Sequence, residues 1–142
     1  VIVLEGINDI GLARSNPSPG TADLIAAHRQ LIERAHARGL KVYGATLAPY
    51  EGAAYFTREG EAKRQALNEW IRTGGAYDGV IDFERVTIDP KTGGLRAEMK
   101  PSTSLPTPGD GLHPNRIGYQ AMGHAIDLDL VRGAKKRRPP KA

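Results

Sequence analysis

The segment that decides the fold is Val1-Ile2-Val3-Leu4-Glu5-Gly6-Ile7-Asn8-Asp9, an apolar run followed by glycine and polar residues. An apolar run without polar alternation is typical of a strand that is buried on both faces of a parallel sheet. Residues 1–6 are therefore expected to form such a strand, whose carboxyl end presents the side-chain amide of Asn8.

Strands and helices alternate along the rest of the chain. Helices are expected over residues 21–38, 57–72 and 115–131, and strands over 41–47 and 79–83. The positions expected to face the core in the helices are Leu24, Ile25, His28, Leu31, Ile32, Ala35, Ala66, Leu67, Trp70, Ile71, Ile117, Ala121, Met122 and Ile126. Thr21 and Asn115 are expected to cap the first and last helices. This order indicates βαβ units with right-handed crossovers, hence an α/β fold with a parallel sheet covered on both faces.

The excess of positive charge lies near the C-terminal end of the sequence rather than on the predicted domain. Basic residues exceed acidic ones by four, but Lys135, Lys136, Arg137, Arg138 and Lys141 all lie beyond the last acidic residue, Asp129. Residues 1–131 are therefore expected to form one nearly neutral domain, followed by a basic, disordered tail over 132–142. A tail-driven binder of nucleic acid or acidic surfaces is an alternative, although such binding would be weak and salt-sensitive.

The residue types that are absent are also informative. The chain has no cysteine, which excludes disulfides, thiolate metal sites and a cysteine nucleophile.

No stretch has the length of a membrane span, and the first residues lack the basic flank of a signal peptide. A chain that begins inside a core strand is expected to be truncated.

The second informative segment is Asp110-Gly111-Leu112-His113-Pro114-Asn115. His113 is a candidate general base, since an imidazole has an unperturbed pKa of about 6.5. Asp110 could accept a hydrogen bond from its ring and fix the tautomer, while Asn8 could donate to a developing oxyanion. The alternatives are a plain strand-end turn at Asn8 and an exposed loop histidine beside a turn aspartate. Because sites of parallel sheets lie at the carboxyl ends of the strands, these three side chains are expected to converge.

Other candidate residues are assigned supporting roles or none. Asp9 is expected to cap the backbone at Gly11 and Leu12 and to hold the Asn8 loop. The serines are Ser15, Ser18, Ser102 and Ser104, and none follows an apolar strand in the strained turn that a nucleophile needs. The nucleophile is therefore unknown. His28, His36 and His124 have no partner at metal-ligand spacing, so no metal site is predicted.

These segments together resemble the SGNH/GDSL hydrolase family of serine esterases and lipases. Gly6-Ile7-Asn8-Asp9 is similar to the family's third block, whose Asn contributes to the oxyanion hole, and Asp110 to Asn115 is similar to the fifth, which holds the catalytic Asp and His. Segments familiar from bacterial members are Trp70-Ile71-Arg72, Asp78-Gly79-Val80-Ile81-Asp82-Phe83 and Gly118-Tyr119-Gln120-Ala121-Met122. The first block, with the nucleophilic Ser, and the second, with a further oxyanion donor, are absent.

The resemblance implies a flavodoxin-like three-layer α/β/α fold, of which this chain supplies about the last three strands. It implies ester hydrolysis by a Ser-His-Asp mechanism, with Asp110 and His113 catalytic, Asn8 in the oxyanion hole and Gly6 and Asp9 supporting the loop. No metal or organic cofactor is implied, the substrate is a small-molecule, carbohydrate or lipid ester, and the compartment is secreted or periplasmic.

Three further expectations follow from the missing blocks and from the loops. The chain alone is expected to be inactive, and a non-catalytic binding module on the same scaffold is the alternative. The strand over residues 1–6 is expected to pair with an upstream segment or another chain, because a bare apolar edge invites pairing. Tyr50, Tyr55 and the aperiodic stretch 87–112 are expected to line the substrate pocket.

Overall fold

The computed structural model describes residues 1–12, 18–100 and 110–132. Its strands β1 (Ile2–Val3), β2 (Tyr43–Ala45) and β3 (Gly79–Ile81) form one parallel sheet in the order β1-β2-β3. Ile2 pairs with Tyr43, and Gly44 pairs with both Val3 and Val80. The predicted α/β fold with a parallel sheet is confirmed.

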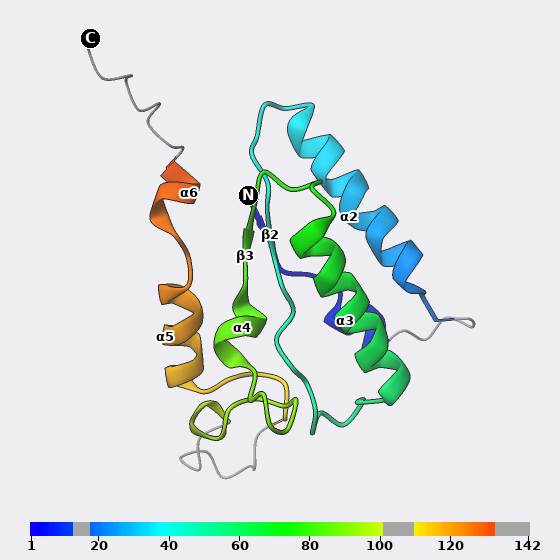
Figure 1. Ribbon diagram of the computed structural model, residues 1–142. Coiled ribbons are helices and arrows are strands. Elements are labelled where there is room, and N and C mark those ends of the chain that lie inside the picture. Colours follow the sequence, from blue (N-terminus) through cyan, green and yellow to red (C-terminus); the bar gives the residue numbers. More distant parts are fainter. Residues whose placement is uncertain (13–17, 101–109, 133–142) are drawn as a thin grey trace.

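Helices cover both faces of this sheet. In chain order they are α1 (Ile7–Gly11), α2 (Thr21–His36), α3 (Arg58–Thr73), α4 (Phe83–Thr87), the 3-10 helix η1 (Ala97–Met99), α5 (Arg116–His124) and α6 (Leu128–Arg132). Figure 1 shows α2 and α3 on one side of the strands and α5 and α6 on the other. The arrangement is therefore the three-layer one.

Each face of the sheet has its own apolar core. The core on the side of α2 and α3 contains Ile10, Leu24, Leu47, Tyr50, Ala53, Leu67 and Ile71. The opposite core contains Tyr43, Ala45, Ile81, Phe83 and Met122, and the Tyr43 hydroxyl also donates to the Leu130 carbonyl of α6 at 2.9 Å. Burial of these side chains supplies the main driving force for stacking the layers.

The predicted cap at Asn115 is confirmed, and Thr57 caps α3 in the same way. The Thr57 hydroxyl accepts from the Gly60 amide at 2.9 Å, and the Asn115 side chain accepts from the amides at the start of α5. The predicted cap at Thr21 is wrong, because α2 has Gly20 as its N-cap and the Gly20 amide donates to the Asp23 carboxylate at 2.8 Å.

Several predicted boundaries and inward positions are also wrong. The third strand stops at Ile81, because Asp82 accepts from the Arg85 amide and starts α4. The last helix is two helices, since the Asp127 carboxylate accepts from the Asp129 amide and begins a new turn. The side chains of Leu31, Ala66 and Ile117, which were expected to face the core, are exposed.

The first strand is an edge strand and is only half buried. Val3 is 7% exposed, whereas Val1, Ile2 and Leu4 are 59%, 44% and 40% exposed. Within the described ranges, β2 is the only strand that pairs with β1. The expectation of burial on both faces is therefore wrong for this chain by itself, because nothing described covers the outer side of β1.

Part of the aperiodic stretch has regular contacts. Ile88 and Leu95 form an antiparallel bridge, and η1 follows. The rest of that stretch, 101–109, lies outside the described residues, as does the basic tail except for Arg132, which ends α6. Among the described helices, none combines the length and the apolar character needed to cross a bilayer.

A buried guanidinium group connects β2 to two helices. Arg64 of α3 is fully buried, donates to the Leu47 carbonyl at 2.7 Å and forms ion pairs of 2.6 Å with Glu61 and Glu84. Asn68, one turn later, accepts from the Leu47 amide at 2.7 Å and donates to the same carbonyl at 2.9 Å. These bonds fix the chain just beyond the carboxyl end of β2.

Replacing this guanidinium group should destabilise the fold. Arg64→Met removes one partner of a buried ion pair, which costs about 3–5 kcal/mol. We expect about 3 kcal/mol here, because Glu84 keeps its ion pair with Arg72, and urea unfolding would measure the loss. Glu59→Gln is the control, since Glu59 pairs with Lys63 at the surface of the same helix and its replacement should leave the midpoint unchanged. Equal midpoints for the two variants would contradict a clamping role for Arg64.

Candidate active site

A pocket of about 330 Å³ opens at the carboxyl edge of the sheet. The residues that line it are Leu4, Glu5, Ile7, Asn8, Leu47, Ala48, Leu112, His113, Pro114, Tyr119 and Met122. They come from the segments after β1 and β2, from the loop before α5 and from α5 itself. The lining is mostly apolar with a few polar groups, as is usual for small-molecule sites.

Asp110 and His113 form a hydrogen-bonded pair beside this pocket. Asp110 Oδ2 lies 2.5 Å from His113 Nδ1, while Oδ1 accepts from the backbone amides of Leu112 and His113 at 3.0 and 2.9 Å. The expected hydrogen bond between the two side chains is therefore present. Since Nδ1 is held by the carboxylate, Nε2 is the ring nitrogen that remains to exchange a proton with a reacting group.

The same contacts determine the charge of Asp110. Partial burial raises the pKa of this carboxyl, but the amide and ring of His113 and the amide of Leu112 lower it more, and the pKa is about 2. Asp110 is therefore a carboxylate at neutral pH. A carboxylate in this position holds the imidazole in one tautomer and stabilises its protonated form.

Asn8 is brought to the same pocket by a short helix. It is the second residue of α1, and both Asn8 and His113 line the pocket. Gly6, the N-cap, has a φ of +122°, and a Cβ there would lie 3.0 Å from a Leu67 methyl carbon. Glycine is therefore required where the chain turns from β1 into α1.

Asp9 was predicted to cap the backbone at Gly11 and Leu12, and this prediction is wrong for Leu12. The Leu12 amide donates to the Asn8 carbonyl at 2.7 Å, because residues 7–11 form a helix rather than an open turn. The predicted lining by Tyr50 and Tyr55 is also wrong. Tyr50 is fully buried in the core, and neither tyrosine contributes to the pocket.

The other polar candidates lie elsewhere or outside the description. The Ser18 hydroxyl accepts from Lys63 at 3.0 Å and is not in the pocket, while Ser15, Ser102 and Ser104 are outside the described residues. His28 is buried and hydrogen-bonds to Tyr77, and His36 pairs with Asp78 at 2.8 Å. Across residues 1–12, 18–100 and 110–132, no group of three or more His, Cys, Asp or Glu could hold a metal ion.

Sequence reasoning missed the residues that support the pocket floor. Leu47 and Ala48 follow β2 directly, so their place at the carboxyl edge could have been predicted from the strand alone. Arg64 and Asn68, which hold Leu47, share a helix face with Ile71 at intervals of three and four residues. Polar residues on an otherwise apolar helix face were the available signal.

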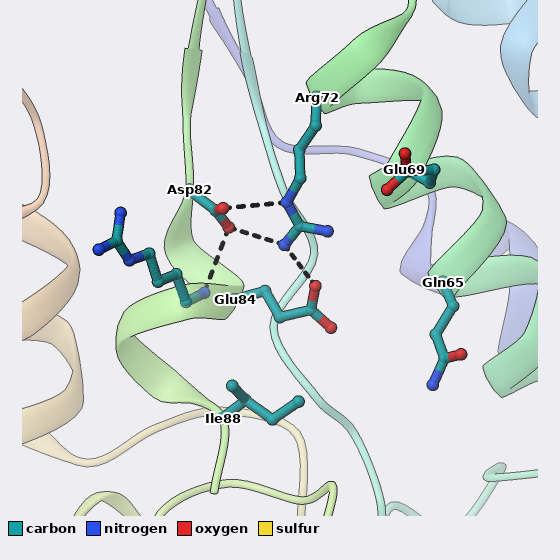
Figure 2. Close-up of a pocket in the computed structure, with 7 residues that line it drawn as sticks. Gln65, Glu69, Arg72, Asp82, Glu84 and Ile88 are labelled. Atoms are coloured by element: carbon teal, nitrogen blue, oxygen red, sulfur yellow. Dashed lines mark hydrogen bonds and ion pairs between the residues drawn. The ribbon is translucent and has the colours of Figure 1, made fainter. Parts of the chain in front are cut away.

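A second pocket, of about 560 Å³, lies between α3 and α4. Figure 2 shows Arg72 between two carboxylates, donating to Asp82 at 2.9 Å and to Glu84 at 2.5 Å. Burial raises the pKa of both carboxyl groups, but the bonds from Arg72 and other donors outweigh it, so both pKa values are lowered. Glu84 also pairs with Arg64, so both carboxylates have a guanidinium partner. This cluster ties α3 to the start of α4, and the first pocket is the candidate active site.

Comparisons with known proteins agree with the α/β fold described above. The sequence model of the GDSL-like lipase/acylhydrolase family matches residues 1–121. The crystal structure of a GDSL-like lipase from Bacteroides thetaiotaomicron is similar, with a TM-score of 0.61 and 20% sequence identity. The match covers 92% of this chain and 61% of that chain, so this chain spans about three fifths of the length of that structure. A comparison with curated proteins finds no match.

The Asp110 carboxyl should titrate near pH 2 in the folded chain, below the ordinary value of about 3.9. His113→Ala removes the ring but keeps both backbone amides, so the pKa should rise and still remain below about 3.9. Carboxyl ¹³C NMR titration of both forms would measure this.

The lowered pKa also has a consequence for stability. A carboxyl whose pKa is depressed by folding stabilises the native state above its unfolded pKa, and this contribution is lost as the pH falls from about 4 to about 2. If the NMR titration of the wild-type chain gave Asp110 a pKa at the ordinary aspartate value, the hydrogen bonds assigned to Asp110 would be contradicted.

Proposed function

Because the chain belongs to the GDSL-like lipase/acylhydrolase family, we propose that it supplies the base, its orienting carboxylate and one oxyanion donor of an ester hydrolase. The observation that carries this proposal is the 2.5 Å Asp110–His113 hydrogen bond beside a pocket that Asn8 also lines. A base oriented by a carboxylate, beside a largely apolar pocket that an amide also lines, suits acyl transfer.

The proposed reaction has two steps and needs a serine from a segment outside this chain. His113 Nε2 takes the proton of the serine hydroxyl as the oxygen attacks the ester carbonyl, and the Asn8 amide donates to the tetrahedral oxyanion. The protonated ring, stabilised by Asp110, then gives its proton to the leaving alkoxide. Water, deprotonated by His113, hydrolyses the acyl-serine in the same way and restores the free enzyme.

The pocket lining and the exposed edge of β1 also indicate the kind of substrate and partner. The mainly apolar lining favours an ester with an apolar part near the carbonyl, from a small molecule, a carbohydrate or a lipid. We further propose that an upstream segment or another chain pairs with β1. The exposure of Val1, Ile2 and Leu4 supports this, because an uncovered apolar edge is otherwise a site of aggregation.

The chain as it stands should be essentially inactive on p-nitrophenyl acetate. A base and an oxyanion donor without a nucleophile leave only weak residual catalysis. Turnover at an ordinary enzymatic rate, abolished by alanine at one of Ser15, Ser18, Ser102 or Ser104, would show that the nucleophile lies within the chain.

In a protein that contains this chain and the upstream serine, His113→Ala should lower kcat by several orders of magnitude, since the base is removed. Asn8→Ala should lower kcat by about 10²–10³-fold, the cost of one oxyanion donor. His124→Ala, at the exposed end of α5, is the matched control and should change little.

Steady-state kinetics would distinguish an ester hydrolase from a non-catalytic binding module. An unchanged kcat in His113→Ala would remove His113 from the mechanism. Ester binding without turnover, even with the serine present, would favour the non-catalytic binding module.

A further inference from the structure

The loop of residues 50–56 lies directly against the backbone of the Asp110–His113 segment. A Cβ placed on Gly111 would lie 2.3 Å from the Gly52 carbonyl carbon and 2.5 Å from the Ala53 amide nitrogen. Both glycines have positive φ, +69° at Gly111 and +101° at Gly52. The two backbones can therefore touch only because Gly111 has no side chain.

The same loop also contacts the helix that carries Asn8. A Cβ on Gly11, the last residue of α1, would lie 2.1 and 2.4 Å from two ring carbons of Tyr55. The Tyr55 hydroxyl is buried and has no hydrogen-bond partner in the described parts of the chain. Burial raises the pKa of Tyr55, and the negative charge of Asp110 raises it further. Tyr55 thus lies directly against α1, and the charge of Asp110 acts on its hydroxyl.

Contacts within the loop and with the core hold Gly52 and Tyr55 in place. Tyr50 is fully buried, and its ring lies 5.9 Å from that of Tyr55 and 5.1 Å from that of Phe56. The Ala53 amide donates to the Tyr50 carbonyl and the Phe56 amide donates to the Ala53 carbonyl, both at 2.9 Å. The loop is therefore anchored through the buried Tyr50 ring and through its own backbone hydrogen bonds.

From these contacts we infer that residues 50–56 are a positioning element for the active site. Gly52 sets where the Asp110–His113 turn lies, and Tyr55 sets where α1 and Asn8 lie. Neither residue touches the pocket, so each acts through another group. The catalytic meaning of this inference rests on the proposed function, but the placement of His113 and Asn8 is measurable without any turnover.

The decisive comparison is between two glycine-to-alanine variants. Gly111→Ala places a methyl group into the Gly52 backbone, whereas Gly39→Ala has nearly the same φ, +68°, and nothing within 4 Å. Both variants carry the same backbone strain, so only Gly111→Ala tests the contact. The readouts on this chain are the NMR signals of the His113 Nδ1 proton and the Asn8 side-chain amide.

We expect Gly111→Ala to shift or abolish the Nδ1 proton signal, and Gly39→Ala to leave it in place. Far-UV circular dichroism would verify that the fold is kept. An unchanged signal in Gly111→Ala, or an equal change in Gly39→Ala, would overturn the inference.

A second pair of variants decides the question if Gly111→Ala fails to fold. Tyr55→Ala removes the ring that supports α1 and should shift the Asn8 amide signals, while Tyr55→Phe keeps the ring and should restore them. Unmoved Asn8 signals in Tyr55→Ala would refute a positioning role for the ring.

Kinetics would link placement to turnover in a protein that also contains the serine. Gly111→Ala should lower kcat about 10²-fold, the usual effect of a misplacement of about 1 Å, with KM little changed. A KM effect without a kcat effect would contradict positioning. If the protein with the serine hydrolyses no ester at all, the proposed function fails, and the NMR comparison still decides whether residues 50–56 place His113 and Asn8.

Discussion

The buried guanidinium group of Arg64 is the interaction on which the rest of this structure depends. Taking a charge out of water is costly, and only well-placed partners offset it. Arg64 has those partners on three segments: Glu61 on its own helix, the Leu47 carbonyl beyond β2, and Glu84 in α4. Because few geometries satisfy all of them, the chain beyond β2 is fixed in one position. The pocket floor at Leu47 and the loop that begins at Tyr50 both follow from it.

Short-range and long-range contacts have separate roles in the candidate site. The orientation of the His113 ring is local, because Asp110, three residues away, accepts from both its ring and its amide. The position of this turn relative to Asn8 depends on distant segments, chiefly the contact between Gly52 and Gly111. A motif of four residues can therefore specify a base and its tautomer, whereas a usable site needs the fold around it.

The same distinction explains what could be predicted from the sequence. Apolar runs, capping residues and the Asp110–His113 spacing are local signals, and they gave the parallel sheet, the cap at Asn115 and the hydrogen bond correctly. The burial of Arg64 could not be foreseen, since charged residues on helices are rarely fully buried. An apolar run such as that before Glu5 shows that a strand favours burial, but it does not show which segment covers it. That is why the exposure of β1 was missed.

The exposed edge and the unidentified nucleophile are connected by geometry. Parallel strands end at the same edge of a sheet, and neighbouring strands lie about 4.8 Å apart. In the proposed function, a strand that pairs in parallel with the free side of β1 would therefore end next to the turn at Gly6 and the pocket that Asn8 and His113 line. A serine at its end would stand where an acyl acceptor is needed. One pairing event would then bury the exposed apolar side chains of β1 and complete the catalytic group, so that stability and activity would depend on the same contact.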